Sequence, residues 1–395
     1  MAAGQAAAEG AQVLVLERSA RLGTKLRITG KGRCNLTNMA ESDEFLAHFA
    51  FLGSEGESRF FLRNAFARFF APDLVAFFDD LGVATVVERG ERVFPVSNDA
   101  HQVADALAKF ARQRGVQMRL QSRVEDLLSH DGRVQGVVLH SGERVAAEAV
   151  VIATGGVSYP KTGSSGDGYR LAEELGHTIV PIRPALVPLV IAGSEPRAMM
   201  GLSLRNIQVR LLLDDQEFAR DFGEMLFTHF GVSGPLILTL SGPAVKRLGQ
   251  GRLEMSVNLK PALSPEQLDA RLRRDLDAFG KRAFRNLLKG LLPAKMIDVV
   301  GARTGIPPEK PAHQITAAER GRLRELLHDF RLAIVGHRPL DEAIVTAGGV
   351  DTREIDPRTM ASRRVEGLYF AGEVLDVQAD TGGYNLQAAF STGYV

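Results

Sequence analysis

Cysteine and tryptophan are nearly absent from this 395-residue chain, which has one cysteine, Cys34, and no tryptophan. A single cysteine excludes a disulfide within the chain and any zinc or iron–sulfur site that needs several cysteines. Proteins without disulfides are typical of reducing compartments. We therefore predict a cytoplasmic protein without a metal site.

The chain also lacks an excess of either charge and any long apolar run. Its 48 Lys and Arg residues nearly balance 47 Asp and Glu residues, which argues against a protein dedicated to nucleic acid. No stretch approaches the roughly 18 apolar residues of a membrane span, and the Ala-rich start lacks the basic residues of a signal peptide. The composition predicts a globular protein of two or three domains that acts on a small molecule, with no nucleic-acid or membrane partner; it leaves the oligomeric state open.

Glycine, by contrast, is abundant, and several of the 40 glycines gather in motifs near the end of the chain. Residues 367–376 and 381–387 (GLYFAGEVLD and TGGYNLQ) predict a strand, a glycine turn and a helix. Ligands of α/β sheets bind beyond the carboxyl ends of the strands, where the N–H groups of a helix N-terminus attract negative charge. Asp376 could bind ribityl or ribose hydroxyls, and residues 382–384 would face the pyrimidine edge of a flavin. Taken alone, the pattern also fits an ordinary strand-to-helix turn.

The start of the chain predicts half of a dinucleotide-binding unit. Residues 1–10 read as an Ala-rich helix, and residues 13–16 as a buried parallel strand followed by Glu17. In such units the acidic residue that binds the ribose hydroxyls lies about 20 residues beyond a G-x-G-x-x-G loop. Counting back from Glu17 places that loop before Met1. We therefore expect a piece of a longer protein that lacks the first strand and its phosphate loop, and the uncapped helix at Val395 points to truncation at that end too.

A basic, glycine-rich segment, residues 23–38, directly follows the first strand. Its glycines let the backbone approach a ligand closely, and Lys25 and Arg33 carry the charges that a diphosphate binds. With Asn35 at its centre, the segment favours a ligand-facing loop over a basic surface loop. Cys34 is either a redox thiol or, as is commoner for a lone cysteine, a small packed side chain.

Two further segments complete the predicted cofactor domain. Residues 117–147 alternate as a β-meander, and residues 149–156 read as a buried strand that ends in two glycines. The following helix, over residues 169–175, is expected to be capped by Ser165 or Asp167. A strand that ends in glycines again brings the backbone close to a ligand.

Together these segments resemble the bacterial flavoprotein family labelled aminoacetone oxidase-like or NAD(P)/FAD-dependent oxidoreductase, which includes bile-acid dehydroreductase-like members. The resemblance covers nearly the whole chain. It rests on residues 22–38, 153–169, 184–188 (PALVP), 226–235 (LFTHFGVSGP), 346–350 (TAGGV) and 367–393.

The resemblance implies an α/β fold with a Rossmann-like FAD-binding domain, whose first strand and GxGxxG loop are missing. This domain would be assembled from residues 1–188 and 336–395. The substrate domain inserted between them would have a β-rich part (189–262) and a helical part (263–335).

The resemblance also implies the cofactor-binding residues, carried over position by position. Glu17 would bind the adenosine ribose, Val124 the adenine, and the glycines after residue 152 the diphosphate region. The full set is Glu17, Lys25, Arg33, Cys34, Asn35, Val124, Ala153, Thr154, Gly155, Gly156, Gly372, Glu373, Asp376, Gly382, Gly383, Tyr384, Asn385 and Leu386. No catalytic residue can be assigned: His229 is a candidate acid or base, although a histidine between aromatic residues is more often a core residue.

The leading hypothesis is an FAD-dependent oxidoreductase that carries out flavin-mediated hydride transfer on an unidentified small molecule. The chain has no second G-x-G-x-x-G loop, so NAD(P)H would have to visit the flavin transiently as the electron donor. Within the enzyme class, the rivals are an amine oxidase that uses O₂ and a donor-dependent reductase of an activated C=C bond. A non-catalytic flavoprotein remnant is the alternative from another class.

Overall fold

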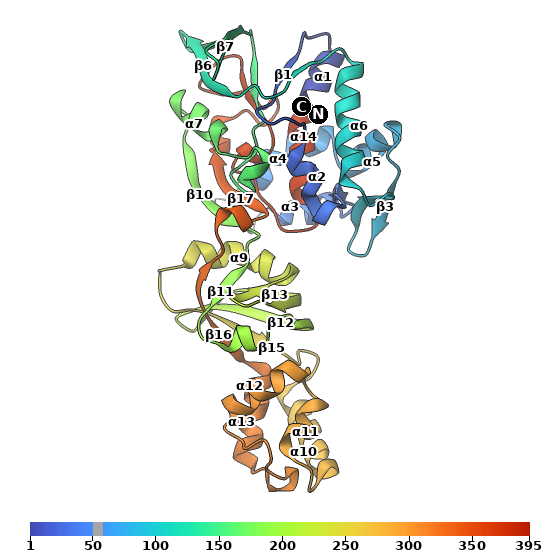
Figure 1. Cartoon of the computed structure of the whole chain (residues 1–395), viewed down its shortest axis with the longest axis vertical. Helices are drawn as coiled ribbons and strands as arrows, with labels where there is room; N and C mark the ends of the chain where they lie inside the picture. Colours follow the sequence, from blue (N-terminus) through green and yellow to red (C-terminus); the bar gives the residue numbers. More distant parts are fainter. Residues whose placement is uncertain (50–57) are drawn as a thin grey trace. The chain divides into compact units, whose positions relative to one another are not determined.

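The computed structural model describes residues 1–49 and 58–395, which divide into two compact units. Unit 1 comprises Met1–Ala185 and Pro339–Val395, and unit 2 comprises Leu186–Arg338 (Figure 1). Unit 1 thus contains both ends of the chain, and unit 2 is one continuous stretch between its two parts.

Two pairs of parallel strands form the Rossmann-type part of unit 1. β1 (Leu14–Leu16) pairs with β5 (Gln117–Arg119), and β9 (Val150–Ile152) pairs with β18 (Leu368–Phe370). Among the described residues each of these strands has a single strand neighbour. Burial is therefore lower than the apolar sequences predict: the β1 side chains are half-buried, and Val151 is 47% exposed.

Antiparallel sheets make up the rest of the β structure of unit 1. The meander predicted over 117–147 is wrong in its first strand, because β5 pairs with β1 and only the later strands pair with one another. The sheets are β6 (Val124–His130) with β7 (Arg133–Leu139) and β8 (Arg144–Ala146); β2 (Thr37–Asn38) with β4 (Arg92–Pro95) and β3 (Thr85–Glu88); and β10 (Ile179–Ala185) with β17 (Val345–Val350).

The helices of unit 1 pack their apolar faces against these strands and one another. In α6 the Asp99 side chain accepts a hydrogen bond from the His101 N–H (2.8 Å), as an N-cap does. The caps expected for α7 are wrong: its N-cap is Gly166 in the left-handed conformation, with no side-chain cap. The helices are α1 (Ala2–Ala8), α2 (Thr24–Ile28), α3 (Ser42–Ala47), α4 (Ser58–Arg68), α5 (Ala71–Asp80), α6 (Ala100–Gln113), α7 (Asp167–Glu174) and α14 (Tyr384–Tyr394).

Unit 2 combines a closed six-stranded barrel with a group of helices. In barrel order the strands are β11 (Leu189–Ile191), β14 (Gly231–Ser233), β13 (Gln216–Phe227), β12 (Ser203–Leu213), β15 (Leu253–Asn258) and β16 (Phe330–His337), and β16 closes on β11. Gly231 is required where β14 pairs with β11, because a Cβ there would lie 2.2 Å from the Leu189 carbonyl oxygen.

The helices of unit 2 share one hydrophobic core with the barrel, which includes Val209 and Met255 of the strands and Leu272 and Leu327 of the helices. They are α8 (Glu195–Ala198), α9 (Pro235–Arg247), α10 (Pro265–Phe279), α11 (Phe284–Lys289), α12 (Ala294–Thr304) and α13 (Ala317–His328). Figure 1 shows α10 to α13 gathered in one group. No helix in the described part of the chain is both long and apolar enough to cross a membrane.

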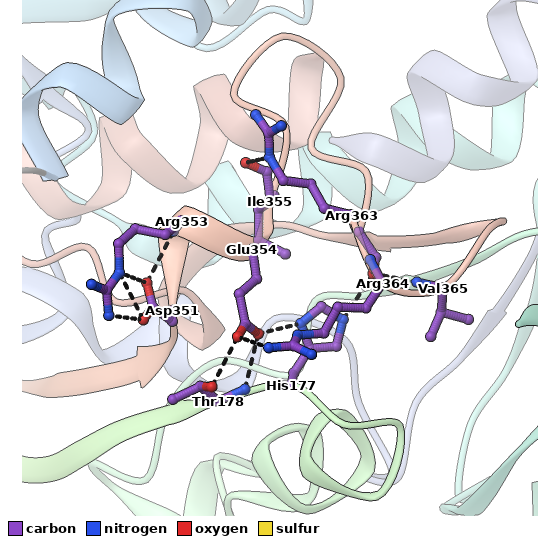
Figure 2. Close-up of polar contacts among 10 residues, drawn as sticks. His177, Thr178, Asp351, Arg353, Glu354, Ile355, Arg363, Arg364 and Val365 are labelled. Carbon is purple, nitrogen blue, oxygen red and sulfur yellow. Dashed lines mark hydrogen bonds and ion pairs between the residues drawn. The ribbon is translucent and has the colours of Figure 1, made fainter.

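A polar cluster around the buried His177 fastens the start of β10 to the loop that precedes β18 (Figure 2). The Glu354 carboxylate accepts hydrogen bonds from the Thr178 N–H (2.9 Å) and hydroxyl (2.8 Å) and pairs with Arg364. The buried His177 ring lies between Glu354 (3.1 Å) and the Ser362 hydroxyl (2.8 Å). Burial alone would raise the pKa of Glu354, but the hydrogen bonds from Arg364 and Thr178 outweigh it and lower that pKa to about 2.

Removing the Glu354 charge should destabilise unit 1. We expect Glu354→Gln to lower the free energy of unfolding at pH 7 by about 2 kcal/mol, because the Thr178 and Arg364 donors lose a buried carboxylate. The carboxylate has a lowered pKa in the folded state, so its contribution is complete above pH ~4.5 and fades as the pH falls towards about 2. Urea unfolding at pH 7 and pH 3 measures both effects.

Glu174→Gln is the matched control for this prediction. Glu174 pairs with Arg170 four residues earlier, but both side chains are more than a third exposed, so the change should cost only a few tenths of a kcal/mol. If Glu354→Gln and Glu174→Gln lower the free energy of unfolding equally, the Glu354 cluster does not stabilise unit 1 more than an exposed ion pair does.

Candidate functional site

The first turn of α14 presents backbone N–H groups without a side-chain cap. Its N-cap, Gly383, has φ 104°, and the residue before it, Gly382, has φ 142°. A Cβ at Gly383 would lie 2.4 Å from the Thr37 carbonyl oxygen, so only glycine fits. Since these N–H groups face outward along the helix axis, they and the positive end of the helix are available to an electron-rich ligand edge.

A polar network around Glu373 lies in the same unit. The Glu373 carboxylate accepts hydrogen bonds from the Lys25 ammonium (2.5 Å), the Ser158 hydroxyl (3.2 Å) and the Thr346 N–H (2.9 Å). Lys25 also donates to the Ser158 hydroxyl (2.7 Å). Four segments that are distant in the sequence therefore meet at one carboxylate.

The glycines after β9 fit against this network. A Cβ on Gly156 would lie 2.2 Å from the Thr346 hydroxyl oxygen and 3.2 Å from a Glu373 carboxylate oxygen. Gly155 has φ 71°, close to Ser164. Ala153 and Thr154, which precede them, are exposed. The strand end thus passes from two exposed residues to a glycine buried against Thr346 and Glu373.

Glu17 directly follows β1 and lies close to the loop that contains Gly163. One of its carboxylate oxygens accepts a hydrogen bond from the Ser19 N–H (2.7 Å) and lies 3.8 Å from where a Cβ on Gly163 would stand. Next to it, Asp167 pairs with Arg18 (2.7 Å) and Arg123 (3.2 Å). Arg123 directly precedes Val124, which is half-buried at the start of β6. The structure thus brings the residues predicted for the ribose and the adenine near one another.

Two residues of the predicted loop lie elsewhere. The Arg33 guanidinium pairs with Glu88, donates to the Asn98 side chain (2.6 Å) and covers the Phe94 ring. Cys34 is fully buried in an apolar cluster, and burial raises the pKa of its thiol to about 12. Cys34 thus packs as a small apolar side chain, the commoner of the two alternatives for a lone cysteine.

Asn35, by contrast, has a buried amide oxygen with no hydrogen-bond partner among the described residues. Asn385 behaves differently: its side chain bridges the backbone of Ala379 and Asp380 and so shapes the turn before α14. Gly372 has φ 78°, and its N–H donates to the Thr392 hydroxyl (3.0 Å). Leu386 packs half-buried in α14.

Sequence reasoning missed a histidine at this site. The His48 ring stacks on the Tyr384 ring, with 4.0 Å between their centroids, and its Nδ1 lies 2.9 Å from an Asp380 carboxylate oxygen. The other Asp380 oxygen is buried without a partner among the described residues. No sequence signal joins residues that are 332 positions apart, although Asp380 directly precedes the TGGYN motif. His229, the histidine that the sequence did suggest, is exposed in unit 2, so its interpretation as a core residue is wrong.

Unit 1 combines two separate pairs of parallel strands, a β9 that ends in glycines and a helix α14 without a side-chain cap. Together these features define an FAD-binding protein of the Rossmann type. A family described as HI0933-like protein Rossmann domain matches residues 1–395. The chain belongs to this family, and its cofactor is FAD.

Curated relatives of similar length agree with this membership. The chain is 35% identical over 387 residues, 98% of its length and 91% of the relative's, to a 3-dehydro-bile acid delta(4,6)-reductase of Clostridium scindens. It is 31% identical over 396 residues, 99% of its length and 92% of the relative's, to a ribosomal RNA dihydrouridine synthase of Escherichia coli.

Solved structures share the fold at low sequence identity. A 3-ketosteroid delta1-dehydrogenase from Sterolibacterium denitrificans aligns with TM-score 0.52 and 13% identity, covering 100% of this chain and 95% of that one. A 3-ketosteroid-delta4-(5alpha)-dehydrogenase from Rhodococcus jostii aligns with TM-score 0.50 and 15% identity, covering 100% and 92%. These likenesses concern the fold alone.

The residues at the α14 end suit the flavin part of FAD. The Gly383 position has no room for a Cβ, the N–H groups of the first helical turn have no side-chain cap, and the Asn35 oxygen is a buried acceptor without a partner among the described residues. A flavin ring carries both acceptors and an N–H donor at its pyrimidine edge, which complements this set.

Loss of Lys25 should weaken FAD binding. In Lys25→Met, Glu373 loses the cation that it pairs with among the described residues, and the carboxylate would repel the negative cofactor. We expect about tenfold weaker FAD binding, about 1.4 kcal/mol, measured by titrating apoprotein with FAD and following the quenching of flavin fluorescence. Lys31→Met removes an exposed lysine from the same loop and should leave the affinity unchanged; equal affinity in the two variants would refute the role of Lys25.

Proposed function

We propose that the protein is an FAD-dependent reductase of a C=C bond conjugated to a carbonyl group, with NAD(P)H as the electron donor. The single observation that carries this proposal is the His48–Asp380 pair beside the uncapped N-terminus of α14. Reducing such a bond requires a hydride at one carbon and a proton at the other. The pair is placed to supply the proton.

The names of two relatives support this class of reaction. A 3-dehydro bile acid with a delta(4) double bond has that bond next to a ring carbonyl, and the uracil ring has its C5=C6 bond next to the C4 carbonyl. The two substrates differ in size and charge but share the reacting fragment. A reductase of this fragment accounts for both relatives better than an amine oxidase does.

When bound, FAD supplies the hydride. The residues of this chain do the rest: Lys25 and Thr346 hold the Glu373 carboxylate beside the cofactor strand. The N-terminus of α14 stabilises negative charge that develops at the facing ligand edge.

His48 Nε2 gives its proton to the carbon next to the carbonyl. Asp380 holds the ring by its Nδ1, while the Tyr384 ring supports its face. Nε2 makes no hydrogen bond with the described residues. We further assign the cofactor to unit 1 and substrate selection to unit 2, in line with the division of the chain.

The reaction itself is tested with purified, FAD-loaded protein under anaerobic conditions. NAD(P)H should bleach the flavin absorbance, and a 3-oxo-delta(4) steroid should then restore it. If colour returns only with O₂, and an amine can replace NAD(P)H as the reductant, the protein is an oxidase and the proposal fails.

The role of His48 is tested by the same two half-reactions. In His48→Gln we expect the reoxidation by the steroid to slow by about 10²–10⁴-fold, the usual contribution of a positioned proton donor. Bleaching by NAD(P)H should stay within about twofold of wild type, because that step needs no proton donor to substrate. His140→Gln, which breaks an exposed histidine–glutamate pair, is the control. If His48→Gln is reoxidised by the steroid at the wild-type rate, the proton comes from solvent and His48 is not the proton donor.

A further inference from the structure

Positive charge is concentrated in one stretch of unit 2, residues 279–297, which we call the basic segment. With 48 basic and 47 acidic residues in 395, a stretch of this length should carry about two of each. Instead it contains no acidic residue and five basic ones: Lys281, Arg282, Arg285, Lys289 and Lys295. The near-zero net charge of the whole chain conceals this local excess.

The five basic side chains are exposed, whereas the apolar residues between them are buried. Phe284, Leu287 and Leu288 of α11 are each at most 1% exposed and pack into the core of unit 2. Arg285 and Lys289 are four residues apart and so share a face of α11. The surface that α11 and its preceding turn offer to solvent is therefore almost entirely cationic.

Few of these charges are neutralised within the chain. Arg285 pairs with the exposed Glu309 (3.1 Å), and Lys295 donates to the Met200 carbonyl (2.6 Å). Lys281, Arg282 and Lys289 form no ion pair with the described residues. Three unpaired cations on one short segment attract an anion with several charges.

The character of the surface decides between possible polyanions. A helix that lies on a membrane exposes large apolar side chains next to its basic ones, but those of α11 are buried. A protein interface is usually centred on an apolar or aromatic anchor, and the exposed part of α11 has none. Closely spaced exposed cations suit the phosphate backbone of a nucleic acid.

We propose that the basic segment is a binding surface for RNA phosphates. This goes beyond the proposed reaction, since binding at this surface requires no reduction of a C=C bond. It also bears on the substrate: of the two candidates, a uracil ring within RNA would reach the protein attached to the polyanion that this surface binds.

The test is filter binding of deproteinised bacterial ribosomal RNA to the FAD-loaded protein over a range of salt concentrations. The variant Lys281→Gln/Arg282→Gln/Lys289→Gln removes the three unpaired cations. We expect its affinity to fall at least tenfold and the slope of log K against log salt to decrease by about 2, since each lost phosphate contact lowers the slope by about 0.7 on single strands.

The matched control is Lys109→Gln/Arg112→Gln/Arg114→Gln, which removes three exposed charges from α6 and its C-terminal end in unit 1. It should bind RNA like the wild type. Flavin absorbance and melting temperature check that both variants are folded. Equal affinity in the two variants, or wild-type protein that binds phosphatidylglycerol vesicles but not RNA, would overturn the proposal.

Reduction of the steroid is assayed in parallel. This assay distinguishes failure of the proposed reaction from failure of the proposed RNA surface. We expect the basic-segment variant to reduce the steroid at the wild-type rate, because the changed residues lie outside the flavin site. RNA binding without reduction of the steroid or of uridine in the RNA would reject the reaction and leave the RNA surface intact.

Discussion

The carboxylate of Glu373 is the contact on which the arrangement of unit 1 depends. Glu373 and its three partners come from four separate parts of the chain. The partners are Lys25, Ser158 and Thr346. A carboxylate with only 20% of its side chain exposed has to be compensated by donors. Satisfying it therefore fixes α2, the loop after β9 and the start of β17 relative to the turn that follows β18.

The sequence revealed this site through its glycines, because a requirement for glycine is a property of a single residue. The places where a Cβ would collide, such as Gly156 and Gly383, lie in the motifs that predicted the cofactor site. Parallel pairing of β1 and of β9 also follows from the apolar, glycine-ended strands. Side-chain partners are different, because tertiary packing selects them. From the sequence, Lys25 and Arg33 are equally good candidates to bind the diphosphate. In the structure Lys25 pairs with Glu373, whereas Arg33 pairs with Glu88.

Long-range pairs and sheet closure were beyond the sequence for the same reason. His48 and Asp380 are ordinary residues at their own positions, and only the packing of α3 against α14 makes them a pair. In unit 2 the alternation of β12 and β15 predicts strands, but closure through β11 and β16 depends on contacts between residues far apart in the chain. Overall charge balance was equally uninformative, because it averages a basic segment in unit 2 with acidic surface elsewhere.

The two candidate substrates need not imply two active sites. A steroid enone and a uracil ring present the same fragment, a C=C bond next to a carbonyl, and one hydride source with one proton donor serves both. What separates them is everything outside that fragment: an apolar ring system in one case and a chain of phosphates in the other. Discrimination should therefore come from surfaces that contact the remote parts of the substrate, because binding energy there determines which molecule is positioned for the reaction. A cationic surface would favour the phosphate chain without altering the shared transfer of hydride and proton, so one reaction can be retained while substrates change.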